Sequence, residues 1–201
     1  SLLDENSFVE IGAKVTARAT DFNVNANDTP SDGVVTGYGV IDGNLVYVYS
    51  QDSSVMGGSI GEMHAKKIVN LYDMALKMGA PVIGLIDSTG LRLEEATDAL
   101  NAFGDLYASS ALASGVIPQI SAVFGSCGGG LALVPALSDF VFMEKSAKMF
   151  VNSPDGICGN NASKCDNSAP DFQAAETGVV DMVADEATIY ASIRELVAML
   201  P

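Results

Sequence analysis

The most constraining feature of this sequence is a glycine-rich junction that follows a buried-type strand. Residues 117–124, Ile-Pro-Gln-Ile-Ser-Ala-Val-Phe, predict a strand, and residues 125–130, Gly-Ser-Cys-Gly-Gly-Gly, follow it before an apolar, helix-like segment. Glycines without Cβ atoms leave the backbone of this junction bare. The peptide N–H groups at the start of the following helix can therefore point at an oxygen atom of a ligand, assisted by the positive end of the helix dipole. This is the physical basis of an oxyanion hole.

A second junction of the same kind follows the run at residues 82–86, Val-Ile-Gly-Leu-Ile. It reads Asp-Ser-Thr-Gly-Leu-Arg over residues 87–92 and again lies between a predicted strand and a predicted helix. Amides from the two junctions are expected to converge on one carbonyl oxygen. The spacing leaves an alternative open, in which both are ordinary turns where glycine permits close packing of a helix on a sheet.

Strand and helix patterns alternate along most of the chain, which predicts an α/β fold with parallel strands and right-handed crossovers. Asp42-Gly43 lies between two β-rich runs and predicts a hairpin. A helix is expected to begin after a capping box formed by Ser59 and Glu62, and to end at Gly79. Further helices are expected near residues 99–111 and 186–200, further strands at 140–143, 148–151 and 178–183, and a polar excursion at 153–170.

The length and composition predict one globular domain spanning residues 1–201, with residues 1–31 as a surface arm. Hydrophobic residues make up 48% of the chain and charged residues only 17%, so we expect association with other chains. The net charge of -15 disfavours binding to nucleic acid or to anionic lipid surfaces. No apolar run reaches membrane-spanning length and the chain does not open with a secretion signal, so the expected location is cytoplasmic.

The three cysteines lack the spacing of a structural zinc site, and no metal is expected in this chain. Cys127, inside the glycine loop, is interpreted as a small buried thiol, with a reactive thiol as the alternative. Cys158 and Cys165 flank a polar loop and are expected to be free thiols, with a disulfide as the alternative.

Residues 57–61, Gly-Gly-Ser-Ile-Gly, match the G-x-S-x-G nucleophile elbow of hydrolases. The only histidine, His64, projects about 140° away from Ser59 on the same helix, and a hydrolase triad needs a histidine far downstream. We therefore interpret Ser59 as a helix cap and His64 as a surface or packing residue. Glu94 and Glu95 are interpreted as complements of a helix dipole, and Arg92 either forms a salt bridge or faces a carboxylate.

Phosphate-loop, HExxH and dinucleotide-binding motifs are absent from the sequence. The candidate catalytic groups of this chain are therefore backbone N–H groups rather than titrating side chains.

At these junctions and in several long blocks, the chain resembles the N-terminal half of biotin-dependent carboxyltransferases, the group of propionyl-CoA carboxylase β-subunits and the transcarboxylase large subunit. The resemblance covers nearly the whole chain. The blocks are residues 32–37 (DGVVTG), 57–65 (GGSIGEMHA), 79–85 (GAPVIGL), 114–121 (SGVIPQIS) and 135–143 (PALSDFVFM).

This resemblance implies a crotonase-like fold, a spiral of ββα units whose oxyanion hole binds a thioester carbonyl. It implies that this half binds acyl-CoA, while a C-terminal domain or subunit binds carboxybiotin supplied by a biotin carboxyl carrier protein, in a homo- or hetero-oligomer. Carried over, Gly128 and Gly129 are the expected donors, with Gly90 and Leu91 as the facing wall. The substrate-binding residues expected from the resemblance are Met56, Gly57, Gly58, Arg92 and Cys127.

The sequence departs from the family at the second junction, where Leu91 replaces a smaller residue and is expected to narrow the acyl pocket. The excursion at residues 157–171 also departs from the family pattern. Candidate partners for the phosphates of CoA are Lys66, Lys67, Lys145 and Lys148. Two alternatives stay open: a free-standing crotonase-type hydratase or isomerase that uses Glu94 or Glu95, and a non-catalytic assembly subunit of a carboxylase or decarboxylase complex.

Overall fold

The seven predicted strands and one short N-terminal strand that the sequence did not predict pair into a single eight-stranded sheet in the computed structural model, which describes residues 1–18 and 29–200. Along the sheet the order is β1-β2-β3-β4-β5-β6-β8, and β7 pairs with β5 outside this path. The strands are β1 (Val9–Ile11), β2 (Val34–Ile41), β3 (Asn44–Gln51), β4 (Val82–Ser88), β5 (Gln119–Gly128), β6 (Phe140–Glu144), β7 (Lys148–Phe150) and β8 (Met182–Ala184).

The first three strands run antiparallel and every later pairing is parallel, as the alternation of elements predicts. The predicted hairpin between β2 and β3 is confirmed, with Ile41 paired to Asn44. Asp42 and Gly43 both have positive φ angles, 47° and 85°, which is the backbone conformation that a tight two-residue hairpin needs. This hairpin followed by α1 (Glu62–Met78) forms the first ββα unit.

Strand β5 holds together two parts of the sheet. Its first half pairs with β6, and its last residues, Ser126 to Gly128, pair with β7. The pairing between β4 and β5 shifts register between Ile86 and Ser88. The carboxyl ends of β4 and β5 therefore lie next to each other, and both glycine junctions start there.

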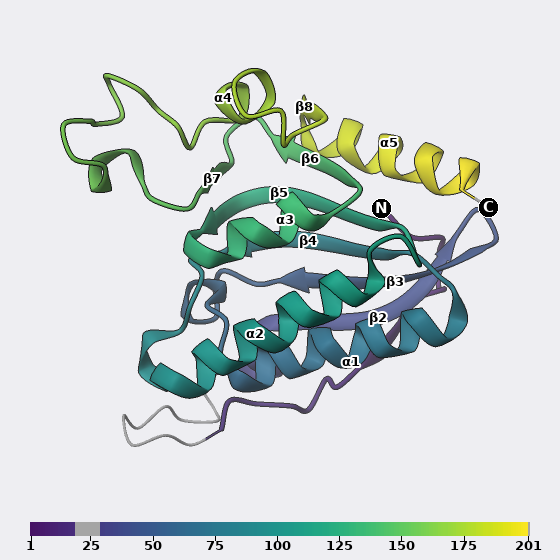
Figure 1. Cartoon of the computed structure of the whole chain (residues 1–201). Helices are drawn as coiled ribbons and strands as arrows, with labels where there is room; N and C mark the ends of the chain where they lie inside the picture. Colours follow the sequence, from purple (N-terminus) through teal and green to yellow (C-terminus); the bar gives the residue numbers. More distant parts are fainter. Residues whose placement is uncertain (19–28, 201) are drawn as a thin grey trace.

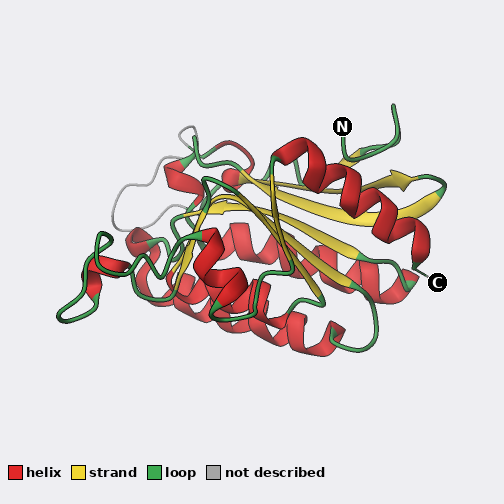
Figure 2. Cartoon of the chain, turned by 90° about the horizontal axis from the view of Figure 1, so that it is seen from above, coloured by secondary structure: helices red, strands yellow, loops and turns green. Residues whose placement is uncertain are grey.

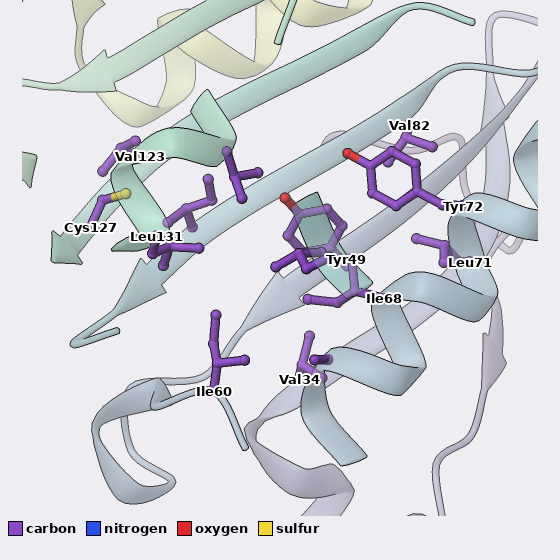
Figure 3. Close-up of a cluster of buried hydrophobic side chains, with 14 of the residues drawn as sticks. Val34, Tyr49, Ile60, Ile68, Leu71, Tyr72, Val82, Val123, Cys127 and Leu131 are labelled. Carbon is purple, nitrogen blue, oxygen red and sulfur yellow. The ribbon is translucent and has the colours of Figure 1, made fainter. Parts of the chain in front are cut away.

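Helices cover both faces of the sheet (Figures 1 and 2). Helices α1 and α2 (Ala96–Ala113) lie side by side on one face, and α5 (Glu186–Met199) lies on the other. The larger core cluster lies under α1 and α2, and Figure 3 shows part of it around Tyr49, Ile68 and Tyr72. A second cluster, which includes Ile189 and Ile193 of α5, fills the opposite face. The short helices α3 (Leu133–Leu137) and α4 (Pro170–Ala175) follow β5 and the polar excursion.

The ends of α1 differ in how well the sequence predicts them. Gly79 ends the helix with a left-handed φ of 65°, as predicted. The capping box was wrong: the residue before the helix is Gly61, no side chain of this residue caps the helix, and Ser59 lies two residues further upstream. The reason is tertiary, because carboxylates from other segments bind the first amides of this helix, as described below.

The N-terminal segment is more than a surface arm in its described part. Strand β1 extends the sheet next to β2, and Leu2 is only 7% exposed in the core cluster under α5. The expected arm also included residues 19–28, which lie outside the described residues. Within residues 1–18 and 29–200, no helix is long and apolar enough to cross a membrane.

Candidate active site

The two glycine junctions are in direct contact. A Cβ atom on Gly90 would lie 2.6 Å from the carbonyl oxygen of Gly128, and one on Gly128 would lie 3.0 Å from the carbonyl oxygen of Thr89. Gly90 also has a φ of 102°, which residues with a side chain rarely adopt. Glycine is therefore required at position 90 by both conformation and space.

The amide of Gly90 does not face a ligand, because it donates to the hydroxyl of Ser88 at 3.1 Å. The neighbouring amide, that of Leu91, is differently placed. Residues 90–92 lie against Ile60, whose N–H donates to the Gly90 carbonyl at 2.8 Å and whose carbonyl accepts from the Arg92 amide at 3.0 Å. In this parallel pairing the N–H of Leu91 points away from Ile60 and makes no turn or loop hydrogen bond among the described residues.

In the other junction, Gly129 opens a short 3₁₀ helix, η5 (Gly129–Ala132). The first amides of a helix have no partner within it, and in the part of the chain that the structure describes no loop bond uses the Gly129 amide. A Cβ atom on Gly129 would have no neighbour within 4 Å, so this residue borders open space. Gly128, in contrast, belongs to β5 and pairs with Phe150 of β7.

The peptides that carry these two amides are both oriented through their carbonyl groups. In a trans peptide the N–H points opposite to the C=O. The Gly90 carbonyl accepts from Ile60, and the Gly128 carbonyl lies against Gly90. Of the four residues expected at the oxyanion hole, Leu91 and Gly129 therefore have available amides, while Gly90 and Gly128 form the contact between the loops.

The segment Met56–Gly58 packs against the backbone of the second junction. The amide of Thr89 donates to the Gly57 carbonyl at 3.0 Å, and a Cβ atom on Gly58 would overlap the carbonyl oxygen of Asp87. Met56 and Gly57 are half-buried and Gly58 is buried. Their expected role in binding substrate stays a prediction.

Arg92 does not reach a substrate, and its expected role as a substrate contact is wrong. The side chain is fully buried. Its Nη1 atom binds Asp32 Oδ1 at 2.5 Å and Glu95 Oε1 at 2.9 Å, Nη2 donates to the Ser59 carbonyl at 2.7 Å, and Nε donates to the Ser59 hydroxyl at 3.2 Å. The salt bridge that the sequence left open is therefore the role that the structure gives to Arg92.

The two carboxylates that bind Arg92 also cap helix α1. Glu95 Oε2 accepts from the amide of Glu62 at 2.6 Å, and Asp32 Oδ2 accepts from the amide of His64 at 2.7 Å. Burial raises the pKa of Asp32, and the Arg92 guanidinium and the His64 amide oppose that shift. We name this group of Asp32, Arg92, Glu95 and the start of α1 the buried ionic cluster.

Glu94 and Glu95 have different surroundings. Glu94 is exposed, whereas Glu95 is 5% exposed and has both oxygens engaged within the buried ionic cluster. A hydratase or isomerase needs a carboxylate aimed at the acyl chain, and Glu95 is not free for that role.

His64 is a packing residue beside the buried ionic cluster rather than a surface residue. Its Nδ1 lies 2.9 Å from the Asp32 carbonyl and its Nε2 lies 3.2 Å from Nε2 of Gln51, which fits a neutral ring protonated at Nδ1. Burial, the largest cause, and the nearby Arg92 charge lower the pKa of His64 to about 3. A neutral, enclosed ring of this kind does not act as a catalytic base.

The thiol of Cys127 is buried in the core cluster under α1 and α2, where Figure 3 shows it near Leu131. Burial raises the pKa of this thiol to about 12. The buried-thiol interpretation is confirmed, and the side chain is not a substrate contact. Cys158 and Cys165 are exposed free thiols, as expected.

The candidate lysines for CoA phosphates separate into two groups. Lys67 is 7% exposed, and its ammonium group binds Ser31 and the carbonyl of Val34, so this expectation is wrong. Lys66 pairs with Glu62 at 2.6 Å and Lys148 with Asp166 at 2.7 Å on exposed faces. Lys145 is exposed and lines an open pocket together with Lys148.

The sequence did not predict the supporting side chains. Asp32 lies in a turn 60 residues before Arg92, and only its presence in the DGVVTG block marked it. Tyr107 donates from its hydroxyl to the Gly130 carbonyl at 2.6 Å, which ties α2 to the helix that Gly129 opens. A hydrophobic cavity of about 330 Å³ lies beside the same helix, lined by Ala132, Leu133, Phe150, Phe172 and Val179 among others.

The two adjoining parallel strands, each followed by a loop with an available amide, belong to an α/β fold. Its likeness to a solved transcarboxylase structure identifies this fold as the crotonase-like fold of the carboxyltransferase class, as the resemblance implied. Residues 1–201 match the model of the carboxyl transferase domain, and the chain belongs to this family.

Curated relatives of this family match the whole length of the chain. The chain is 44% identical over 205 residues to the methylmalonyl-CoA decarboxylase subunit alpha of Propionigenium modestum. It is 45% identical over 207 residues to the propionyl-CoA carboxylase beta chain of Roseobacter denitrificans. In both comparisons all of this chain is matched, and it spans 40% of the length of the relative.

Among solved structures, transcarboxylase 12S, crystallised as a hexamer assembly with methylmalonyl-coenzyme A and methylmalonic acid bound, superposes with a TM-score of 0.93 at 36% identity. The match covers 100% of this chain and 40% of that chain. In the described residues, no group of His, Cys, Asp and Glu side chains is arranged to hold a metal ion.

Proposed function

We propose that this chain is the acyl-CoA-binding half of a biotin-dependent carboxyltransferase. It would move a carboxyl group between carboxybiotin and the α-carbon of a short acyl-CoA. The observation that carries this proposal is the pair of available amides, Leu91 and Gly129, on loops that touch through Gly90 and Gly128. The relatives named for propionyl-CoA and methylmalonyl-CoA support the choice of a short acyl-CoA.

The chemistry needs an enolate at the thioester, and negative charge then develops on the thioester oxygen. Fixed N–H donors stabilise that charge without changing protonation state, and they act strongly in a water-poor site. The thioester oxygen would accept from the amides of Leu91 and Gly129. Carboxybiotin, when a partner delivers it, supplies the carboxyl group and a nitrogen that accepts the α-proton. A chain with one histidine, buried and neutral, is compatible with this division of work.

The partners of the chain would be a C-terminal carboxyltransferase domain or subunit and a biotin carboxyl carrier protein, within an oligomer. Several large hydrophobic side chains near the Gly129 helix and the polar excursion are exposed, and they suit a protein partner: Leu133, Leu137, Val151 and Ile157. The hexamer assembly of the transcarboxylase neighbour supports an oligomer. The exposed free thiols of Cys158 and Cys165 fit a reducing compartment, and we propose a cytoplasmic location.

The phosphates of CoA would bind at Lys145 and Lys148, with Lys66 as a further candidate. Lys145 is exposed, and Lys148 is shared with Asp166 rather than buried. Since the chain carries a net charge of -15, we expect a partner to supply additional positive charge.

Titration calorimetry of the chain with acetyl-, propionyl- and malonyl-CoA tests the substrate class. We expect binding heat with at least one of these thioesters and none with the corresponding free acids, acetate, propionate and malonate. Absence of heat with all three thioesters would contradict the proposal.

A second test uses the assembled enzyme carrying Gly129→Val. Valine is β-branched and Gly129 has a φ of 64°, so the turn that orients this amide would be distorted. We expect about a 100-fold or greater loss of carboxyl transfer, in the range seen when one oxyanion donor is removed. Full activity would instead favour a non-catalytic assembly role.

A further inference from the structure

We infer that Arg92 is a positioning residue, and that its buried guanidinium holds the Leu91 amide in the direction that the reaction requires. This inference rests on the proposed function and extends it to a side chain that contacts no substrate.

The backbone on either side of Leu91 is hydrogen-bonded to Ile60. Residues 90–92 are tied to Ile60 by the hydrogen bonds from the Ile60 amide to the Gly90 carbonyl, 2.8 Å, and from the Arg92 amide to the Ile60 carbonyl, 3.0 Å. Among the described residues, this isolated bridge orients the Leu91 peptide through the Gly90 carbonyl. If Ile60 moves, the Leu91 amide turns with it.

The Arg92 side chain binds the same segment through Ser59. Its Nη2 donates to the Ser59 carbonyl at 2.7 Å, which belongs to the peptide bond that carries the Ile60 amide. Its Nε donates to the Ser59 hydroxyl at 3.2 Å. The main chain and side chain of Arg92 therefore form a closed ring with Ser59 and Ile60, and the Leu91 amide projects from this ring.

The same arginine links this ring to the start of helix α1. Nη1 of Arg92 binds Asp32 and Glu95, and these carboxylates accept from the amides of His64 and Glu62 at the start of α1. The chain keeps space for this arrangement, because a Cβ atom on Gly61 would overlap the Glu95 carboxylate. The junction is thereby anchored to a 17-residue helix rather than to a loop.

A role in stability alone explains this arrangement poorly. Removing a guanidinium and two carboxylates from water costs much of what their attraction returns, and hydrophobic packing of similar volume is often as stable. The planar fork of arginine makes four directed bonds here, which a lysine ammonium on a single point cannot reproduce. This site therefore depends on the directions of the Arg92 hydrogen bonds more than on the charge of the side chain.

The test compares the assembled carboxyltransferase carrying Arg92→Lys with the wild type and with Arg194→Lys. Arg194 is the matched control, since it also pairs with two carboxylates, Asp4 and Asp42. It belongs to α5, on the opposite face of the sheet from α1. We expect Arg92→Lys to lower kcat about 10- to 100-fold while KM for acyl-CoA changes less than about threefold, because the amide acts on charge that appears only in the transition state. We expect Arg194→Lys to leave both constants unchanged.

An activity-independent measurement accompanies the kinetics. We expect amide hydrogen exchange of residues 88–92 to accelerate in Arg92→Lys, with exchange in the middle of α1 unchanged. Ser59→Ala removes only the hydroxyl that accepts from Nε, and it serves if Arg92→Lys does not fold; we expect about a threefold fall in kcat at constant KM. A loss of kcat that follows the folded fraction, or unchanged exchange at 88–92, would overturn the inference. If the wild-type enzyme shows no carboxyl transfer, the proposed function is contradicted. The hydrogen exchange of residues 88–92 then still decides whether Arg92 orients this segment.

Discussion

The two junctions present the same chemical group, a backbone amide, but they are held in different ways. The junction at residues 88–92 depends on side-chain charges, since the buried ionic cluster connects it to Asp32 and to the start of α1. The junction at residues 128–130 depends on the backbone, through the pairing of β5 with β7 and the contact of Gly128 with Phe150. The Leu91 amide is therefore positioned by directed side-chain hydrogen bonds, and the Gly129 amide by the pairing of neighbouring strands.

The largest expected effect comes from the residue at which the two junctions touch. In Gly90→Ala the new methyl group would lie 2.6 Å from the Gly128 carbonyl at a φ of 102°, so one of the two loops must move. We expect carboxyl transfer to fall at least about 100-fold, as for the loss of an oxyanion donor. Steady-state kinetics of the assembled enzyme measures this.

Gly79→Ala is the matched control for that substitution, since Gly79 lies at the end of α1 and takes no part in either junction. A Cβ atom there meets nothing within 4 Å, so only the cost of its φ of 65° remains, about 1–2 kcal/mol for a left-handed residue. Equal losses of activity in the two variants would show that the close approach of the two junctions is unimportant.

His64, beside the buried ionic cluster, is expected to make the free energy of unfolding depend on pH. His64 has a folded pKa of about 3 against an ordinary value of 6.5. Below pH 6.5 the unfolded chain binds a proton that the folded chain does not, so stability is full above pH 6.5 and falls as the pH drops towards 3. We expect the free energy of unfolding to fall by about 2 kcal/mol between pH 7 and pH 5.

Denaturant unfolding at the two pH values measures this effect, and His64→Gln is the comparison variant. Since the chain has one histidine, the variant should show a much flatter profile between pH 7 and pH 5. Asp32, whose pKa is raised by burial, acts in the opposite sense and is present in both proteins. Equal pH dependence in the two proteins would contradict the assignment of the effect to His64.

A smaller effect is expected for Tyr107→Phe, which removes the hydrogen bond to the Gly130 carbonyl. Since strand pairing also holds this junction, we expect kcat to fall only about two- to tenfold, as for one neutral hydrogen bond. Tyr190→Phe, on the opposite face of the sheet against Phe124, is the control. A larger loss than in Arg92→Lys would reverse the comparison between the two junctions.

The smallest effect on kcat is expected for Leu91→Ala, which should change substrate selectivity instead. The Leu91 side chain is half-buried and packs against the core cluster under α1 and α2, so its amide should stay in place. We expect the variant to change the choice of acyl-CoA, with kcat/KM for butyryl-CoA relative to acetyl-CoA rising about three- to tenfold, at or below the low end of what one methylene contact is worth in a hydrophobic pocket. An unchanged ratio would place the acyl group away from this side chain.

Much of the fold follows from local chemistry that the sequence displays. Asp42-Gly43 predicts its hairpin because both residues tolerate positive φ, and Gly79 predicts the end of α1 for the same reason. The glycines of both junctions also predicted that the two loops meet, since the ends of adjacent parallel strands lie at one edge of the sheet.

Only the tertiary structure decided which groups of that site are available. Gly90 has the bare backbone of a donor, yet Ser88 takes its amide, and Leu91 next to it is the residue with an available N–H. The sequence left Arg92 open as a substrate contact or a salt bridge, and the tertiary structure surrounds it with the carboxylates of Asp32 and Glu95. The physical reason is that backbone conformation depends on residues a few positions apart, whereas the partner of a buried charge or amide depends on segments that only folding brings together.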